Sequence, residues 1–265
     1  MDRYSWEENI WEHLQEVGTS TRGLAAFDFD NTMIQNDLGE AIMKELLDNK
    51  LLYYKGDFAK HFRDEAAAIQ IRSEGGQEDF TQFVWQEYDY IMEKQGAEEA
   101  YRWTSFIFSG MSVAELKEIS RNTWKKNLSC KNIFPFREIV SLVQFLQDLD
   151  WDVRIVTASP QVCIEEVSWE FGIKPEKVIG MQLEEVEGVI APKILEPFTY
   201  GKGKVEALKK NTEQRLDLAF GDSWNDYPLL TSSQLGVLID KGDDLLREEC
   251  LGNGILVQPV FDSKD

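Results

Sequence analysis

Two aspartates separated by one residue follow a short apolar segment near the start of the chain. Asp28 and Asp30 lie in the run Phe27-Asp28-Phe29-Asp30-Asn31-Thr32, directly after the apolar residues 24–27. Strand side chains repeat their direction every second residue, so both carboxylates can face one substrate. An aspartate is ionised at neutral pH and can attack phosphorus without an activating histidine. We predict that Asp28 is a nucleophile and that Asp30 protonates the leaving group and then activates water.

A hydroxyl-bearing segment follows a second short run. Thr157 and Ala158 come after the mostly apolar residues 153–156. A threonine hydroxyl and main-chain N–H groups at this place can hold phosphoryl oxygens, because phosphoryl transfer depends on positioning and electrostatics. We predict that Thr157 and Ala158 bind phosphate, and Ser159 is an alternative to Thr157.

An acidic segment follows a third run, residues 216–220, and reads Gly221-Asp222-Ser223-Trp224-Asn225-Asp226. Carboxylate oxygens are hard ligands that favour Mg²⁺. We predict that Asp28 and Asp222 bind Mg²⁺, and that Asp226 and Asn225 orient the metal's waters or a neighbouring lysine from outside the ligand set. We expect no zinc site, because His13 and His61 are the only histidines.

A lysine is needed near these carboxylates, because an anionic nucleophile must approach an anionic phosphate. Lys204 begins a helical pattern ahead of the third apolar run, and Lys202 lies two residues before it. We predict that Lys204 and Asn225 complete the phosphate site, with Lys202 as the alternative to Lys204.

The pattern of elements predicts an α/β fold. Short apolar runs that end in polar clusters are typical of central strands of a parallel sheet covered on both faces. Residues 139–149 have helical spacing ahead of the second run, so strands and helices alternate as in a doubly wound, Rossmann-like sheet. We also predict a hairpin within residues 178–191 and closing strands at 236–239 and 255–260.

A long insert separates the first strand from the rest of this core. Residues 58–71 and 80–92 are amphipathic, and Ser112-x-x-Glu115 has the spacing of a helix capping box. We predict a helical cap at residues 41–132 on a three-layer α/β/α core formed by residues 1–40 and 133–265.

The composition limits the possible partners. The 265 residues include 48 acids and 28 bases, giving a net charge of −20, which repels nucleic acids and anionic membranes. No apolar run approaches a membrane span, and the first residues lack the pattern of a signal or transit peptide. Three widely spaced cysteines fit a reducing compartment. We expect a cytoplasmic protein with no nucleic-acid or membrane partner, and the sequence identifies no protein partner.

These motifs together resemble those of the haloacid dehalogenase-like phosphatases, specifically the phosphoserine phosphatase-like branch. The resemblance covers most of the chain and rests on Asp28-x-Asp30-x-Thr32, Ile155-Val156-Thr157-Ala158-Ser159, Gly203-Lys204-Val205-Glu206-Ala207-Leu208 and Gly221-Asp222-Ser223-x-Asn225-Asp226, in family order. It implies an aspartyl-phosphate intermediate on Asp28, Mg²⁺ held by Asp28, the Asp30 carbonyl and Asp222, and a helical cap.

A second resemblance concerns the insert. The segments Tyr101-Arg102-Trp103, Phe108-Ser109-Gly110-Met111-Ser112 and Asp37-Leu38-Gly39-Glu40 resemble phosphorylcholine phosphatases, which are typically exported. Asp37 and Glu40 fit a helix cap by their spacing. They also fit a specificity site, because carboxylates joined by aromatics such as Trp85, Tyr88, Tyr90 or Trp103 attract a substrate ammonium group.

The sequence as a whole predicts a Mg²⁺-dependent phosphatase that acts on a small phosphomonoester. Phosphoserine, phosphocholine and phosphoethanolamine are the leading substrates, and a sugar phosphate remains an alternative. Two other functions stay open: a phosphotransferase or mutase, in which another hydroxyl intercepts the aspartyl phosphate, and a catalytically idle binding module. Acceptor-dependent product formation distinguishes the first, and absence of turnover distinguishes the second.

Overall fold

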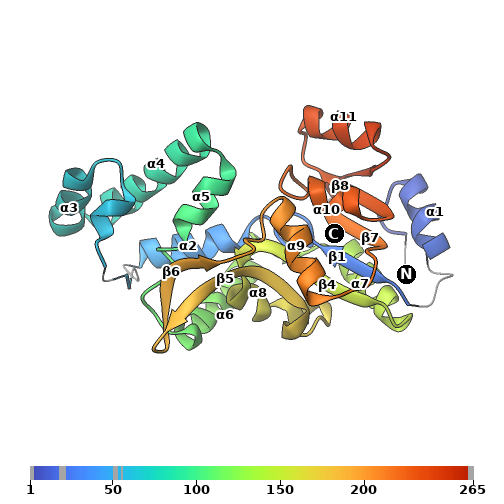
Figure 1. Ribbon diagram of the computed structural model, residues 1–265, viewed down its shortest axis with the longest axis horizontal. Coiled ribbons are helices and arrows are strands. Elements are labelled where there is room, and N and C mark those ends of the chain that lie inside the picture. Colours follow the sequence, from blue (N-terminus) through green and yellow to red (C-terminus); the bar gives the residue numbers. More distant parts are fainter. Residues whose placement is uncertain (1–2, 18–21, 50–52, 55, 262–265) are drawn as a thin grey trace.

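A seven-stranded sheet forms the centre of the molecule (Figure 1). The computed structural model describes residues 3–17, 22–49, 53–54 and 56–261. The strand order is β6-β5-β4-β1-β7-β8-β9, and every neighbouring pair is parallel except β5 and β6. The strands are β1 (Leu24–Phe27), β4 (Asp152–Pro160), β5 (Val178–Val186), β6 (Val189–Leu195), β7 (Leu218–Gly221), β8 (Leu235–Asp240) and β9 (Leu256–Pro259). The predicted mainly parallel sheet is confirmed.

Helices cover both faces of this sheet. Side chains of β1 alternate between two hydrophobic clusters, as the period of two in a strand requires. Leu24 and Ala26 pack in one cluster, whereas Ala25 and Phe27 pack in the other. The first cluster includes residues of α9 (Lys202–Asn211), α10 (Tyr227–Ser232) and α11 (Asp244–Gly252), and the second includes residues of α1 (Glu8–Val17) and α7 (Arg137–Asp148). The predicted three-layer α/β/α core is therefore confirmed.

The second strand is longer than its apolar run predicts. We expected it to end at Val156, but β4 continues to Pro160, so that Thr157 and Ser159 belong to the strand. The extension pairs with β5 between Pro160 and Met181, after a shift of register beyond Val156. Backbone pairing with β5, which the apolar pattern does not reveal, continues the strand to Pro160.

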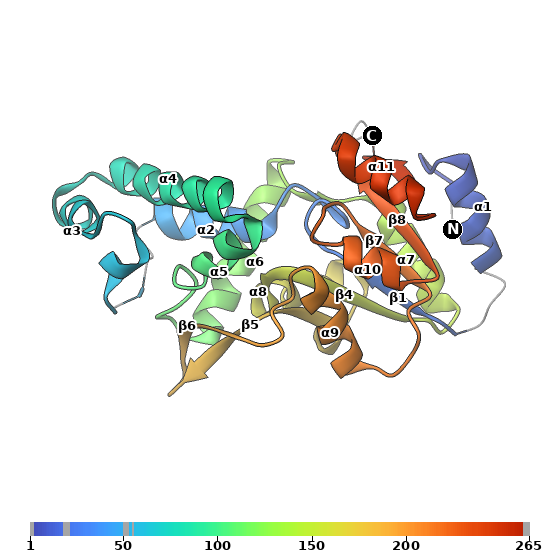
Figure 2. The same ribbon diagram turned by 45° about the horizontal axis from the view of Figure 1, so that its top comes forward.

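The insert is helical, and it lies to one side of the sheet (Figures 1 and 2). Its elements are α2 (Leu38–Asp48), the short 3₁₀ helix η1 (Phe58–His61), α3 (Glu65–Glu74), α4 (Gln77–Gln95), α5 (Ala97–Thr104) and α6 (Val113–Ser129). At its base, β2 (Ile34–Gln35) pairs antiparallel with β3 (Phe134–Pro135). The predicted cap boundary between residues 40 and 41 falls inside α2, which continues from the core loop into the insert.

One predicted helical segment of the insert is interrupted. Residues 58–71 contain η1 and the first part of α3, with a break at residues 62–64. The side chain of Asp64 accepts a hydrogen bond from the main-chain N–H of Ala67 at 2.9 Å, so it caps a new helix. The capping box of Ser112 and Glu115 at the start of α6 is confirmed.

The predicted hairpin is also confirmed and joins the insert to the core. Strands β5 and β6 meet at Glu187 and Gly188, which both have positive φ angles, 52° and 80°, as a tight hairpin turn requires. Main-chain hydrogen bonds connect Gly110 N–H to the Ile190 carbonyl at 2.8 Å and Ile190 N–H to the Met111 carbonyl at 2.9 Å. The hairpin and the insert therefore share backbone pairing.

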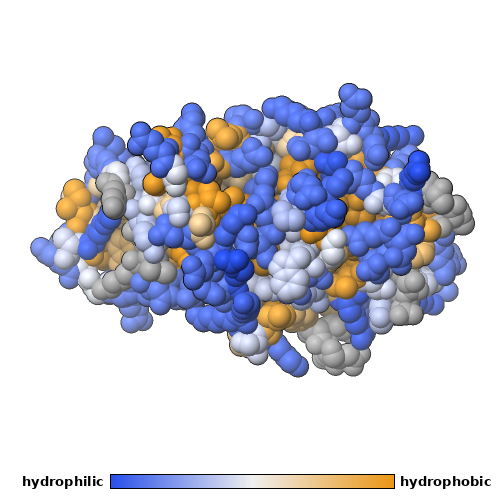
Figure 3. Space-filling model, turned by 90° about the horizontal axis from the view of Figure 1, so that it is seen from below, coloured by the Kyte–Doolittle hydropathy of each residue, from blue (hydrophilic) through white to orange (hydrophobic). Residues whose placement is uncertain are grey.

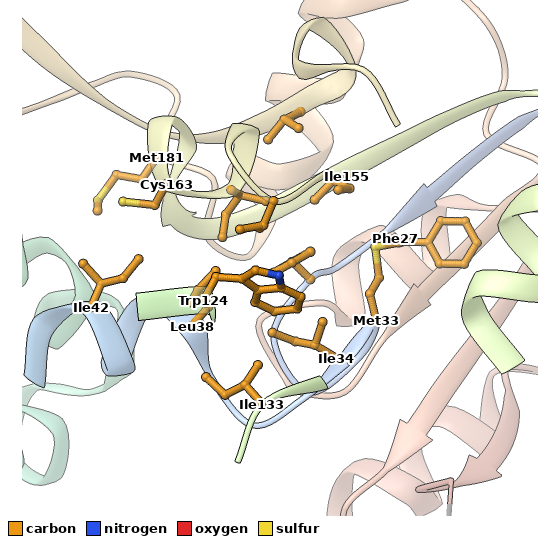
Figure 4. Packing of buried hydrophobic residues seen from close by; sticks show 14 of the residues in the cluster. Phe27, Met33, Ile34, Leu38, Ile42, Trp124, Ile133, Ile155, Cys163 and Met181 are labelled. Atoms are coloured by element: carbon orange, nitrogen blue, oxygen red, sulfur yellow. The ribbon is translucent and has the colours of Figure 1, made fainter. Parts of the chain in front are cut away.

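A hydrophobic cluster fills the space between the insert and the sheet (Figure 4). The indole of Trp124, from α6, lies near Ile34 of β2 and Leu38 of α2. The remaining short elements are α8 (Gln161–Glu165) and the 3₁₀ helices η2 (Ser168–Phe171) and η3 (Pro175–Lys177). Burying a large aromatic here stabilises the join between the insert and the core.

The outer surface agrees with the acidic composition. The face shown in Figure 3 is largely hydrophilic, with apolar residues in scattered groups. Within the described ranges, no helix combines the length and apolarity that spanning a bilayer requires.

Candidate active site

Three sequence-predicted segments line one cavity at the carboxyl ends of β1, β4 and β7, and the segment of Lys204 lies behind its wall. Asp28 follows the last residue of β1, Asp222 follows the last residue of β7, and Thr157 lies in the extension of β4. The cavity is lined by Asp28, Asp30, Asn31, Asp37, Tyr101, Thr157, Ala158, Ser159, Asp222, Ser223, Asn225 and Lys241. Asp28 and Asp30 thus face the same space as Asp222, which the nucleophile and acid assignments require.

Lys204 lies behind the cavity wall and contacts the predicted nucleophile. Its side chain is fully buried, with Nζ 2.6 Å from Asp28 Oδ1 and 2.5 Å from Asp226 Oδ1. Burial disfavours the charged lysine, but the carboxylates of Asp226 and Asp28 outweigh this effect and raise the pKa of Lys204.

Lys202, the alternative suggested by the sequence, is exposed. The lysine that reaches the predicted nucleophile is therefore Lys204, and its predicted contact with phosphate stays a prediction.

Asp226 holds the acidic loop together. Its Oδ2 accepts hydrogen bonds from the main-chain N–H groups of Asp222 and Ser223, both at 3.1 Å, and from Ser223 Oγ at 2.9 Å. A Cβ atom at Gly221 would lie only 2.3 Å from the Asp226 Cβ, so the close approach requires glycine. With Oδ1 on Lys204, both oxygens of Asp226 are used in positioning the lysine and the loop.

Asp28 and Asp222 converge in a way that suits a divalent cation. The Thr32 hydroxyl lies 3.3 Å from both Asp28 Oδ2 and Asp222 Oδ1, so two carboxylates approach one weak donor. Oxygens of Asp28, Asp222 and Asp226 all lie within 4.8 Å of one another. Asp226 does not line the cavity, whereas Asp28 and Asp222 do, and each of these two has one oxygen whose contact is the weak one with Thr32. Asp28 and Asp222 are therefore the side chains available to a cation. This hard oxygen set fits Mg²⁺.

The surroundings raise the pKa values of these two carboxyl groups. Burial, followed by the charge of Asp226, raises the pKa of Asp28 well above its usual range, although Lys204 acts in the opposite direction. Burial and Asp226 likewise raise the pKa of Asp222. Crowded carboxylates of this kind are stabilised by a cation placed between them.

Asp30 is held in a fixed orientation. Its Oδ1 accepts the main-chain N–H of Leu38 at 2.7 Å, and its Oδ2 accepts the Ser159 hydroxyl at 2.6 Å. Burial raises the pKa of Asp30 to about 6, while the two hydrogen bonds act in the opposite direction. A carboxyl group with this pKa can both donate and accept a proton near neutral pH, as an acid and base must.

The three predicted phosphate ligands of the cavity wall differ in their contacts. The Asn225 Oδ1 accepts the main-chain N–H of Gly201 at 2.6 Å and so connects the acidic loop to the start of α9. Thr157 Oγ1 accepts the Ser159 N–H at 3.1 Å. Thr157, Ala158 and Asn225 all line the cavity, and their phosphate contacts stay predictions.

Two contributors to the site were not assigned these roles from the sequence. Ser159 was considered only as a rival of Thr157 for phosphate, yet its hydroxyl contacts Asp30. Lys241, which follows β8, was missed, and its Nζ lies 2.6 Å from Asp222 Oδ2. The sequence did place Lys241 shortly after a predicted closing strand. It could not be assigned to the site from this alone, because a single lysine belongs to no motif with fixed spacing.

A second, smaller cavity adjoins the first beneath the insert. Its walls are Asp37, Gly39, Glu40, Met43, Tyr88, Tyr101, Thr104, Phe108, Ala158, Ser159, Pro160 and Met181. Asp37, Tyr101, Ala158 and Ser159 line both cavities. Burial, together with the neighbouring carboxylates of Asp30 and Glu40, raises the pKa of Asp37. The predicted cap role of Asp37 is confirmed, since its Oδ1 accepts the Glu40 N–H at 2.7 Å.

Only one of the four aromatics suggested by the sequence reaches this second cavity. Tyr88 lines it. The Trp103 indole N–H instead donates to the His61 carbonyl within the insert, and the Tyr90 ring lies beneath the Arg63 guanidinium. Trp85 lines a separate groove beside α2 and α6. Tyr101, which stands in the segment that resembles phosphorylcholine phosphatases, supplies the second ring of the cavity.

Comparisons with solved structures show the same fold at low identity. A conserved protein of unknown function from Anaerococcus prevotii has a TM-score of 0.79 and 18% identity, covering 97% of this chain and 93% of its own. A HAD family hydrolase from Salmonella enterica serovar Typhi has a TM-score of 0.55 and 13% identity, covering 98% and 82%. A phospho-aspartyl intermediate analogue of phosphoserine phosphatase has a TM-score of 0.54 and 16% identity, covering 92% and 96%.

The comparison with protein families identifies the family of the chain, whereas the solved structures show the fold alone. No curated protein matches the chain significantly. The haloacid dehalogenase-like hydrolase family matches residues 25–231, most of the chain, and this range includes the four motif segments. The chain therefore belongs to the haloacid dehalogenase-like hydrolase family.

Proposed function

We propose that the protein is a Mg²⁺-dependent phosphatase that hydrolyses a small phosphomonoester through an aspartyl phosphate on Asp28. The observation that supports this most is the shared cavity of Asp28, Asp30 and Asp222, with the buried Lys204 bonded to Asp28. A binding module needs no second carboxylate with a raised pKa beside the first. Asp30 therefore favours catalysis over binding alone.

The reaction has two steps. In the first, a carboxylate oxygen of Asp28 attacks phosphorus, the bond from phosphorus to the leaving-group oxygen breaks, and Asp30 protonates that oxygen. In the second, Asp30 takes a proton from a water molecule that attacks phosphorus, which releases phosphate and restores the Asp28 carboxylate. Lys204 orients Asp28 throughout, and Thr157, Ala158 and Asn225 bind the phosphoryl oxygens.

The metal would be held by Asp28 and Asp222, together with the Asp30 carbonyl that the family resemblance implies. When bound, Mg²⁺ supplies positive charge that offsets the repulsion between the carboxylate and the phosphoryl group. The side chains of Asp28 and Asp222 approach each other closely enough for this role, as their shared contact with Thr32 shows.

The proposed metal requirement predicts loss of activity on chelation. Purified protein with Mg²⁺ should release phosphate from members of a broad phosphomonoester panel, and excess chelator should stop the release because Asp28 and Asp222 then repel the substrate. Fresh Mg²⁺ should restore it without added zinc. Phosphate release measured by a colorimetric assay provides the test. Full activity in chelator, or no turnover on any member of the panel with Mg²⁺, would refute the proposal.

The second cavity supports a proposal for the leaving group. Asp37 and Glu40 place carboxylates beside the rings of Tyr88 and Tyr101. Burial, followed by the neighbouring carboxylates of Asp30 and Glu40, raises the pKa of Asp37. An ammonium group on the leaving group would meet attraction from both the charges and the ring faces. We therefore propose amino alcohol phosphates such as phosphocholine, phosphoethanolamine or phosphoserine as substrates.

This preference predicts a difference between two substrates of equal shape. Phosphocholine should show a kcat/KM about 10- to 100-fold higher than 3,3-dimethylbutyl phosphate, in which carbon replaces the charged nitrogen. Asp37→Asn, which keeps the helix cap because asparagine caps equally well, should reduce this ratio. The control is Glu93→Gln, which removes one charge from the exposed surface of α4. Equal kcat/KM for the two substrates would contradict the assignment of this cavity.

A further inference from the structure

Lys241 is a second lysine of the active site, and it differs from Lys204 in its freedom to move. Its Nζ lies 2.6 Å from Asp222 Oδ2, and its side chain is 43% exposed. Lys204 is fully buried between two carboxylates. Lys241 lines the cavity of Asp28 and Asp222, whereas Lys204 is absent from its walls. Of these two cations, Lys241 is the one in the substrate cavity.

The backbone around Lys241 is anchored, although its side chain is not enclosed. The Asp240 carboxylate accepts the Gly242 N–H at 2.8 Å and the Arg247 guanidinium at 2.7 Å. The Asp243 carboxylate accepts the Trp224 indole N–H at 3.0 Å, which connects this loop to the acidic loop of Asp222. The loop therefore presents the lysine at a fixed place, from which its four-carbon chain can swing.

Several charged groups act on the ammonium group of Lys241. Asp222, Asp28 and Asp37 all act on it as attracting charges, and it acts in turn on Glu40 of α2. Mg²⁺ bound by Asp28 and Asp222 would repel the ammonium from Asp222. A phosphate dianion in the same cavity would attract it, and a flexible lysine is well suited to bind phosphate as a point charge.

We propose that Lys241 is a mobile phosphate-binding residue: its ammonium neutralises Asp222 in the metal-free protein and contacts the phosphoryl group when Mg²⁺ and substrate are present. This inference rests on the proposed function, since it assumes the same metal and phosphate sites. It assigns Lys241 two measurable properties. The lysine competes with Mg²⁺ for Asp222, and it strengthens the binding of phosphate once Mg²⁺ is bound.

The test measures the two binding events separately on Lys241→Met, Lys241→Arg and a matched control. The control is Lys209→Met, which removes one positive charge at an exposed position of α9. Titration calorimetry gives the Mg²⁺ affinity of the substrate-free protein at about physiological salt, where long-range charge effects are screened. Binding of inorganic phosphate is then measured with Mg²⁺ saturating.

Lys241→Met should bind Mg²⁺ about two- to fivefold more tightly than Lys209→Met, because the competing ion pair, in which only the lysine is exposed, has been removed. It should bind phosphate about tenfold more weakly, because a charge-assisted hydrogen bond is lost. Lys241→Arg should remain near the unmodified protein in both titrations, since it keeps the charge.

Each part of the inference has a contradicting result. Mg²⁺ affinity in Lys241→Met that equals or falls below that of Lys209→Met would overturn the competition, and unchanged phosphate affinity would overturn the phosphate contact. Neither measurement requires turnover. Protein that gives both expected affinities yet releases phosphate from no ester would refute the proposed function and leave the assignment of Lys241 intact.

Discussion

Asp28→Asn is expected to reduce phosphate release by about 10⁴-fold or more, because an amide oxygen does not form an acyl phosphate at a useful rate. The variant keeps the shape of the side chain and an oxygen that can accept from Lys204. Acid quenching of the unmodified enzyme during turnover, followed by mass spectrometry, should find a phosphoryl group on the peptide that contains Asp28. The same peptide from the variant should carry none.

The variant should remain folded. Burial, followed by the charge of Asp226, raises the pKa of Asp28, although Lys204 acts in the opposite direction, so the ionised carboxylate is disfavoured in the native structure and the neutral amide avoids this cost. Its thermal midpoint should therefore not fall below that of Asp48→Asn, which removes one charge from the exposed end of α2. Activity of Asp28→Asn within tenfold of the unmodified enzyme, with the amide verified by mass, would end the nucleophile assignment.

Lys204→Met is expected to lower the free energy of unfolding by about 3–5 kcal/mol, because it leaves two buried carboxylates without their shared cation. Both partners of the lysine are buried, with side-chain exposures of 8% for Asp28 and 0% for Asp226. Chemical denaturation at neutral pH, without Mg²⁺, measures the change. Activity should be lost as well, since Asp28 is no longer oriented.

Lys202→Met is the matched control and also tests the alternative that the sequence leaves open. Lys202 lies on the same helix but is exposed, so its replacement should change the free energy of unfolding by less than about 0.5 kcal/mol. Adding Asp226→Asn to Lys204→Met should recover part of the lost stability, because one uncompensated charge is removed. Equal stability of the two single lysine variants would contradict the role of Lys204 as a buried counter-ion.

The sequence predicted the parts of the fold that depend on local patterns. The apolar run 24–27 coincides with β1, because a central strand must be apolar on both faces. The extension of β4 past Val156 could not be predicted in the same way, since its pairing with β5 depends on residues more than twenty positions away. The break in residues 58–71 was missed because amphipathic spacing continues across the 3₁₀ turn and the new cap at Asp64.

The site could be predicted where several motifs had fixed spacing. Asp28, Asp30 and Asp222 meet at one cavity because strands of a parallel sheet end at the same edge. The contacts among them could not be predicted, since the buried position of Lys204 and the hydrogen bond of Ser159 to Asp30 depend on packing. Lys241 had no motif, and its relevance emerges only from the position of β8 beside β7.

The hydrogen bond from Leu38 N–H to Asp30 connects proton transfer at Asp30 with recognition of the leaving group by α2. Leu38 is the first residue of α2, and the same helix supplies Glu40 and Met43 to the smaller cavity. A leaving group that fits the smaller cavity poorly would tilt α2. The tilt would move the main-chain N–H of Leu38 away from Asp30. Discrimination between esters would then be expressed in the rate of bond cleavage as well as in affinity.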